Sequence, residues 1–196
     1  MYWSSTLWSG HRQTDVPRLP IMKIRRSCIQ FCIVVLLSAQ APKPDFTGRW
    51  EVDKSLSTAK TTFVKHPELN GPPAPVAPVG HEFDTMRPQT ITHRDPSLVI
   101  VDESAGSLPA RTFKLTTDSK PNISELPGGG VNRSSTRWDG NQLVTEWVLE
   151  RGGTPIMRGS DRRTLSSDGS KLIQETTVLT PLHEAQLHIV WIRKPQ

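Results

Sequence analysis

The sequence predicts an all-β protein: an antiparallel up-and-down barrel of eight to nine strands, preceded by a signal peptide. From Asp45 onward, apolar residues alternate with polar ones or form short runs bounded by turn residues. No window of about a dozen residues shows the period of about 3.6 residues that marks a helix. Short strands at hairpin spacing are typical of a barrel or a sandwich, and their meander order favours the barrel.

The first predicted strand runs from Phe46 to Asp53. Its apolar residues Phe46, Trp50 and Val52 share one face with Gly48, because successive side chains of a strand point to opposite sides. The charged residues of the segment fall on the other face. We therefore expect a strand with one buried face and one solvated face.

A long Pro-rich loop is expected at residues 55–88. The alternation stops there, and five prolines between Pro67 and Pro78 confine the backbone. Within this segment, a short helical turn is expected near Ser57 to Phe63.

Eight more strands are expected after the loop. The turn signals that separate them include Asp95-Pro96-Ser97 and the dipeptides Asp139-Gly140, Gly152-Gly153 and Asp168-Gly169. The expected strands are 89–94, 98–103, 110–117, 132–138, 142–150, 157–165, 171–179 and 186–193.

Residues 22–41 have the three parts of a secretory signal peptide. They begin with the basic segment Met22 to Arg26, continue with the apolar run Phe31 to Leu37, and end with the small residues of Ser38-Ala39-Gln40-Ala41. The apolar run is too short to span a bilayer as a helix. We therefore expect export to the periplasm or secretion.

Cleavage after Ala41 would divide the chain into a leader and one domain at 42–196. Residues 1–21 precede the basic start and are interpreted as an upstream extension from a misplaced start codon; the alternative is an unusually long n-region of the signal peptide. The whole chain has a formal charge of +5, but residues 1–41 hold five of its 24 basic residues, one of its 19 acidic residues and both cysteines. The remainder has a net charge of +1, which predicts no nucleic-acid partner. No stable membrane insertion is expected after cleavage.

Two segments carry a resemblance to a known superfamily. Gly48-Arg49-Trp50, on the first strand of an exported all-β domain, resembles the G-x-W motif of the lipocalins and the wider calycin superfamily. The opening segment, with Trp138-Asp139-Gly140, looks like uncharacterised bacterial exported lipocalin-like proteins. The resemblance implies that Arg193, just after the last strand, packs over Trp50 in a cation–π contact and closes the barrel with Gly48.

Strand parity indicates where a ligand would bind. Thr136 and Trp138 share one strand face, and Thr145 and Trp147 share a face of the next strand. If these faces point inward, they line a cavity for an amphipathic molecule. In the alternative, the tryptophans fill a packed core and the hydroxyls face water. These four residues and Arg137 are the candidate ligand-binding residues.

Arginines are concentrated in the second half of the chain. One that points into the barrel would bind a ligand carboxylate through its planar guanidinium, whereas most arginines on strands face solvent. The arginines considered are Arg133, Arg137, Arg158, Arg162 and Arg163.

No catalytic residue, metal site or cofactor is predicted. His183 to His188 resembles the H-E-x-x-H zinc motif but is one residue too long and leads into a strand. His81, Glu82, Asp84 and His93 lack the spacing of metal ligands. There is no G-x-S-x-G motif.

These observations predict an exported, non-catalytic protein that holds a small apolar or amphipathic ligand in a barrel cavity. The main alternative is a filled barrel that docks a protein partner through Pro67 to Pro88. A third interpretation is an enzyme on a calycin-like barrel, which would need an acid–base pair with a shifted pKa in a cavity.

Overall fold

The computed structural model describes residues 43–71, 83, 86–106, 109–126 and 128–195. These residues belong to one compact unit, Ala41–Gln196. The expected upstream extension at 1–21 and signal peptide at 22–41 lie outside the described residues, as does Pro72 to Pro78 of the Pro-rich loop.

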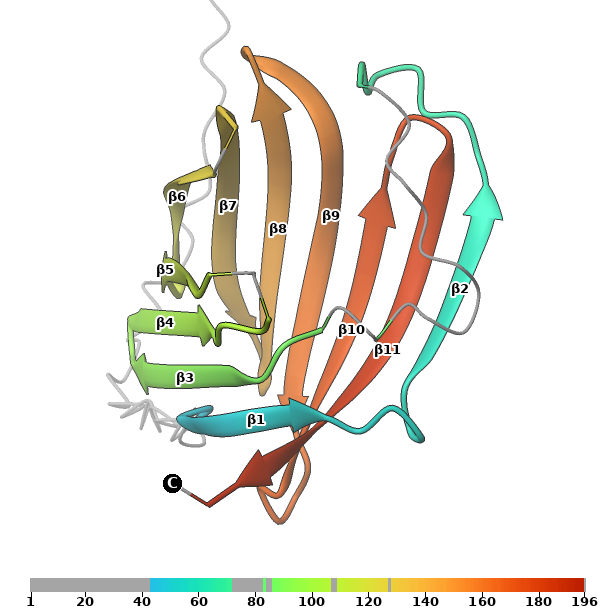
Figure 1. The fold of residues 1–196 in the computed structure, drawn as a ribbon. Helices are drawn as coiled ribbons and strands as arrows, with labels where there is room; N and C mark the ends of the chain where they lie inside the picture. Colours follow the sequence, from blue (N-terminus) through green and yellow to red (C-terminus); the bar gives the residue numbers. More distant parts are fainter. Residues whose placement is uncertain (1–42, 72–82, 84–85, 107–108, 127, 196) are drawn as a thin grey trace, which may run out of the picture. The chain divides into compact units, whose positions relative to one another are not determined.

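Eleven strands form one sheet in which every pairing is antiparallel (Figure 1). Their order is β5-β4-β3-β1-β11-β10-β9-β8-β7-β6, with β2 beside β11. The strands are β1 Gly48–Val52, β2 Thr58–Phe63, β3 Gln89–Arg94, β4 Ser97–Asp102, β5 Arg111–Thr116, β6 Asp118–Leu126, β7 Gly130–Asp139, β8 Gln142–Arg151, β9 Thr154–Leu165, β10 Lys171–Leu179 and β11 His183–Lys194.

Pairing between the first and last strands turns this sheet into a nearly closed barrel. On β1, Trp50 lies opposite Arg193 of β11 on one edge and opposite Gln89 of β3 on the other. The two ends of the strand order, β5 and β6, are consecutive in the chain. The backbone N–H of Thr116 donates across them to Asn122 Oδ1 at 3.0 Å. In Figure 1 the short strands β1, β3 and β4 cross the lower end of the long strands β7 to β11.

The architecture confirms the all-β antiparallel barrel. The described residues form eleven strands, whereas the sequence predicts eight to nine. Two strands were not expected from the sequence. β2 occupies the segment where a loop with a helical turn is expected, and it pairs with the N-terminal half of β11. β6 begins directly after the expected strand 110–117, and its pairing with β7 is irregular between Asp118 and Pro121.

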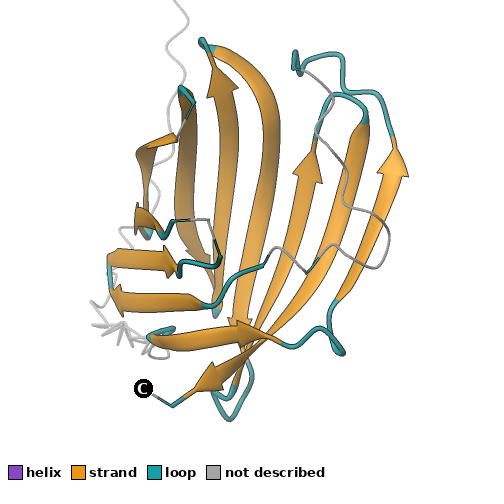
Figure 2. Ribbon diagram, viewed as in Figure 1, coloured by secondary structure: helices purple, strands orange, loops and turns teal. Residues whose placement is uncertain are grey.

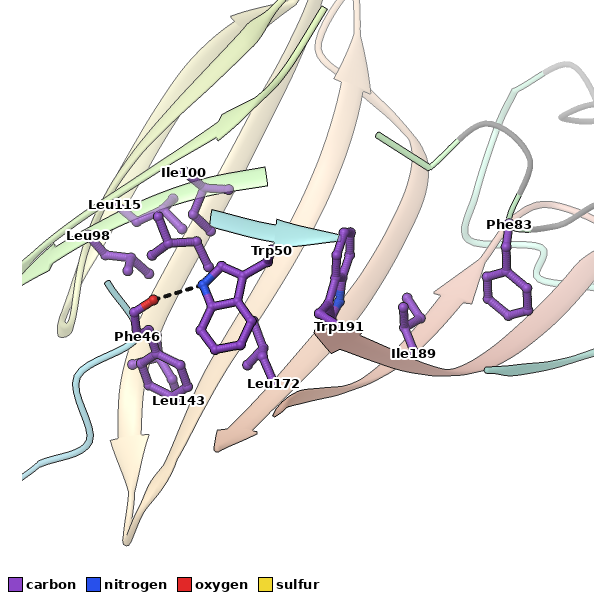
Figure 3. Packing of buried hydrophobic residues seen from close by; sticks show 11 residues of the cluster. Phe46, Trp50, Phe83, Leu98, Ile100, Leu115, Leu143, Leu172, Ile189 and Trp191 are labelled. Atoms are coloured by element: carbon purple, nitrogen blue, oxygen red, sulfur yellow. Dashed lines mark hydrogen bonds between the residues drawn. The ribbon is translucent and has the colours of Figure 1, made fainter. Parts of the chain in front are cut away.

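The apolar core lies where β1 crosses the long strands. Trp50 and Trp191 are almost wholly buried there, and the indole N–H of Trp50 donates to the carbonyl oxygen of Phe46 at 3.0 Å (Figure 3). The other buried members of the cluster are Phe83, Ile91, Leu98, Ile100, Leu115, Leu143, Leu172 and Ile189. This core fills one end of the barrel and anchors the first and last strands.

Figure 2 shows the described residues as strands and loops. In this part of the chain, no helix has the length and apolar character needed to cross a membrane.

Candidate functional site

Arg193 closes the filled end of the barrel over Trp50. Its guanidinium carbon lies 4.5 Å from the centroid of the Trp50 ring, which confirms the expected cation–π contact. The Nη1 of Arg193 also donates to the carbonyl oxygen of Thr47 at 2.9 Å. Gly48 has a φ of +154°, which side chains with a Cβ rarely adopt, so the backbone requires glycine there.

Trp138 also belongs to this closed end, and it does not line the cavity at the other end of the barrel. Its ring stacks on Phe46 with centroids 5.9 Å apart, and its centroid lies 5.7 Å from that of His93. Its indole N–H donates to Asp95 Oδ1 at 2.9 Å. The structure therefore places Trp138 at the closed end, where its ring packs on Phe46 and His93.

Asp95 joins three segments at the closed end, and its charge should make stability depend on pH. Hydrogen bonds from Thr117, Trp138 and Lys43, in that order of effect, hold the pKa of this carboxyl well below its usual range. Because the pKa of Asp95 is lower in the folded state than its value of about 4 in the unfolded state, the ionised carboxylate stabilises the protein above about pH 4. This stabilisation is lost as the pH falls from about 4 toward the folded-state pKa.

We expect Asp95→Asn to lower the free energy of unfolding by about 1 kcal/mol near neutral pH, since the carboxyl is partly exposed. The difference between wild type and variant should narrow progressively below about pH 4. Urea denaturation across the acid range measures it, with Asp139→Asn as a control at an exposed carboxyl. A difference independent of pH would contradict the assigned role of the charge.

Beyond the core, the barrel encloses a cavity of about 350 Å³ whose wall is mainly apolar. The interior is therefore filled at one end and open at the other. Seven strands, β3 to β9, contribute to the wall. The lining residues are Gln89, Ile100, Asp102, Phe113, Leu115, Leu126, Asn132, Ser134, Thr145, Trp147, Leu149, Met157, Asp161 and Arg163.

Two of the five candidate ligand-binding residues, Thr145 and Trp147, lie in this wall. Thr136 is fully buried beside them, and its hydroxyl oxygen lies 3.0 Å from that of Thr145. Arg137 is absent from the wall. Its side chain is 43% exposed, and its Nη1 lies 3.0 Å from Glu146 Oε1, so the structure corrects its expected position.

The arginine in the cavity wall is Arg163. It is 7% exposed, and its Nε has no hydrogen-bond partner among the described residues. It lies opposite Leu143 of β8, a core residue. The sequence held a signal for this orientation, because Arg163 has the same strand parity as the apolar Met157 and Leu165. A buried N–H group without a hydrogen-bond acceptor is energetically unfavourable, and an anionic ligand that accepts from Nε would relieve this cost.

Two carboxylates share the wall with Arg163. Asp161 accepts hydrogen bonds from the hydroxyl of Thr176 at 2.6 Å and from the amide of Gln174 at 2.9 Å, and these neutral donors stabilise its carboxylate. Burial raises the pKa of Asp102, and the charge of Arg87 partly opposes this increase. The wall therefore combines an arginine whose Nε lacks a hydrogen bond with two acids that interact with protein groups.

Within the described residues, no group of three or more His, Cys, Asp and Glu side chains is placed to hold a metal ion. His183 and His188 lie an odd number of positions apart on β11 and so point to opposite faces of the sheet. His93 packs against Phe46, and burial lowers its pKa. The other three residues considered as ligands, at positions 81, 82 and 84, lie outside the described residues.

Comparison with known proteins gives a fold likeness alone. No family model and no curated protein matches the chain. A solved structure titled REP1-NXSQ fatty acid transporter is 12% identical with a TM-score of 0.46, and the match covers 76% of this chain and 96% of that chain. A mutant of that transporter is 11% identical with a TM-score of 0.44, covering 76% and 97%. Likenesses this distant assign neither a family nor a ligand.

Proposed function

We propose that the barrel binds a small amphipathic molecule, with its apolar part in the cavity and an anionic group at Arg163. The observation that carries this proposal is the buried side chain of Arg163 in a mainly apolar wall, with a guanidinium Nε that has no hydrogen-bond partner among the described residues. Guanidinium groups bind carboxylates and phosphates through two parallel hydrogen bonds. A single charged contact in an otherwise apolar cavity is the arrangement expected for a ligand with one polar end.

Burial of the apolar part supplies most of the binding free energy. Phe113, Leu115, Leu149 and Met157 present side chains to the cavity. Each methylene group transferred from water into such surroundings contributes about 0.8 kcal/mol. A cavity of about 350 Å³ lies within the range of small-molecule sites, although near its lower end.

Tryptophan fluorescence tests ligand binding directly, because Trp147 lies in the cavity wall and Trp138 does not. Titration of the purified protein with palmitic acid should change the emission in the wild type. We expect Trp147→Phe to remove most of this change and Trp138→Phe to preserve it. A wild-type protein whose emission does not respond, and which carries no ligand in a native mass spectrum, would overturn the proposal.

We propose that the protein binds its ligand without transforming it. Asp102 favours the enzymatic alternative to some extent, since it is a cavity acid with a raised pKa. Ligand recovered by extraction after prolonged incubation with the protein should have an unchanged mass and chromatographic retention. Conversion that is lost in Asp102→Asn would establish the enzyme instead.

Export is part of the same proposal and rests on residues 22–41. The N-terminal sequence of protein recovered from a secretory host should begin at or close to Pro42. Retention of Met22 to Arg26 in the exported protein, or failure of export, would contradict it.

A further inference from the structure

A second cavity, of about 320 Å³, adjoins the first. Gln89 and Asp102 line both and so lie at the boundary between them. The wall of this second cavity is mainly polar and includes Arg87 and Arg111. We call it the polar cavity, and the cavity that contains Arg163 the apolar cavity. Their adjacency matches the two parts of an amphipathic molecule.

Two arginines give the polar cavity its positive charge. Arg87 has a side chain that is 7% exposed; its Nη1 donates to the carbonyl oxygen of Pro109 at 2.6 Å, and its Nη2 lies 3.9 Å from Asp102 Oδ2. These contacts fix Arg87 in the wall. Arg111 lies opposite Asp102 in the pairing of β4 with β5, and it is exposed. The polar cavity thus has one fixed guanidinium and one that can adjust to a ligand.

The charges around the two cavities favour an anion. Three arginines, Arg87, Arg111 and Arg163, outnumber the two carboxylates, Asp102 and Asp161. Asp161 accepts hydrogen bonds from neutral groups. Burial raises the pKa of Asp102, whereas the charges of all three arginines lower it.

We infer that the polar cavity holds the phosphate of a single-chain lipid whose alkyl chain occupies the apolar cavity, an inference that rests on the proposed function. A phosphate monoester carries a charge of about −1.5 to −2 and offers three acceptor oxygens, which suits several guanidinium groups. A carboxylate has two oxygens and matches one guanidinium, so a carboxylate at Arg163 would leave the polar cavity without an anion.

The apolar cavity has the length that an alkyl chain needs. Its lining on β9 runs from Met157 to Arg163, a rise of about 20 Å at roughly 3.3 Å per residue. Leu126 and Leu149 lie at the end far from Arg163, and Gln89 and Asp102 lead into the polar cavity. A chain that extends from the boundary toward Met157 would place its phosphate among the three arginines.

Four probes separate the contributions of chain, head size and phosphate. Palmitoyl lysophosphatidic acid has both parts, monopalmitoyl glycerol lacks the phosphate, palmitic acid lacks the glycerol phosphate head, and glycerol phosphate lacks the chain. We expect the wild type to bind the lysophosphatidic acid at least about tenfold more tightly than either of the other chain-bearing probes. Glycerol phosphate alone should show no binding at the same concentrations.

Arg111→Gln tests the polar cavity without disturbing the buried Arg87. We expect it to weaken lysophosphatidic acid binding about tenfold and to leave the Kd of palmitic acid and monopalmitoyl glycerol unchanged. Arg137→Gln, on the outer face, is the matched control and should change none of these values. Calorimetric titration and the emission of Trp147 measure all four probes.

Each other outcome overturns a defined part of the inference. Palmitic acid binding as tightly as lysophosphatidic acid, with monopalmitoyl glycerol weaker, would reject the phosphate while the proposed function stands. Equal binding of all three chain-bearing probes would also reject the anionic contact at Arg163. Binding of glycerol phosphate as tight as that of the lipid would show that the site takes a free phosphate compound. If no chain-bearing probe binds, the proposed function fails together with the inference.

Discussion

The Arg163→Met protein is expected to bind an anionic amphipathic molecule about tenfold to a hundredfold more weakly than the wild type, the effect of losing a charge-assisted hydrogen bond in a cavity. Its free energy of unfolding should be unchanged or higher. The Nε of Arg163 has no partner to lose, and methionine has a similar length without the buried charge. Fluorescence titration and urea denaturation of the same samples measure both quantities.

Arg162→Met provides a matched control for this prediction. Arg162 is the preceding residue on β9, it is half exposed, and its Nη1 lies 3.6 Å from Asp139 Oδ2. Its replacement should leave the Kd close to the wild-type value. If Arg163→Met left binding of the anion unaltered, or weakened an uncharged analogue to the same extent, Arg163 would not hold the anionic group.

Gly159→Ala is expected to destabilise the protein by about 3 kcal/mol, the upper range for forcing an added group into a packed interior. A Cβ at this position would lie 2.3 Å from the carbonyl oxygen of Thr177 and 2.5 Å from Cζ2 of Trp147. The first of these atoms belongs to the backbone of β10, which cannot move without disturbing its pairing with β9. The ring of Trp147 therefore takes its place in the cavity wall only because residue 159 has no side chain.

Denaturation midpoints of two further proteins test this explanation. Gly130→Ala should change stability little, because its Cβ would lie no closer than 3.4 Å to another atom. Combining Gly159→Ala with Trp147→Ala should recover part of the loss, since it removes the ring contact but leaves the contact with Thr177. A destabilisation below about 1 kcal/mol for Gly159→Ala would contradict the close packing seen here.

Most of the strands follow from local sequence. The expected bounds of β3 and β10, 89–94 and 171–179, agree with the structure, and the other seven expected strands differ by no more than three residues at either end. Each of these strands has one face that carries apolar residues, which produces the alternation that predicts a strand. Glycine at Gly140, Gly153 and Gly169 has a positive φ, as the expected hairpin turns require.

The two strands that were missed have no such alternation, for a physical reason. On β2, five of the six residues are exposed, so its sequence records no buried face. On β6, Asn122 is the only buried residue, and Pro121 interrupts the pairing. Both lie at the margin of the sheet, where hydrogen bonds to a single neighbouring strand hold them in place.

The closed end of the barrel was predictable and the ligand site only partly so. Gly48, Trp50 and Arg193 meet as the lipocalin resemblance implies, because the first and last strands must pair to close a meander. Thr145 and Trp147 reach the cavity wall, whereas Trp138 and Arg137 do not. The strand position of Trp138 predicts an inward side chain, but the residue lies at the filled end of the barrel. Strand parity does not give the depth of a residue along the barrel, and so it did not predict this position.

The sequence by itself determined the fold class, the alternation of faces and the near-neutral charge of residues 42–196, because each depends on residue type and spacing along one strand. Apolar parity indicated the inner face of some strands, as on β9, but only the tertiary structure fixed the inner face of every strand. A period of two divides every strand into two faces, and closure of the sheet selects one of them. Arg162 and Arg163 are chemically identical neighbours, and closure places the first in solvent and the second in the cavity.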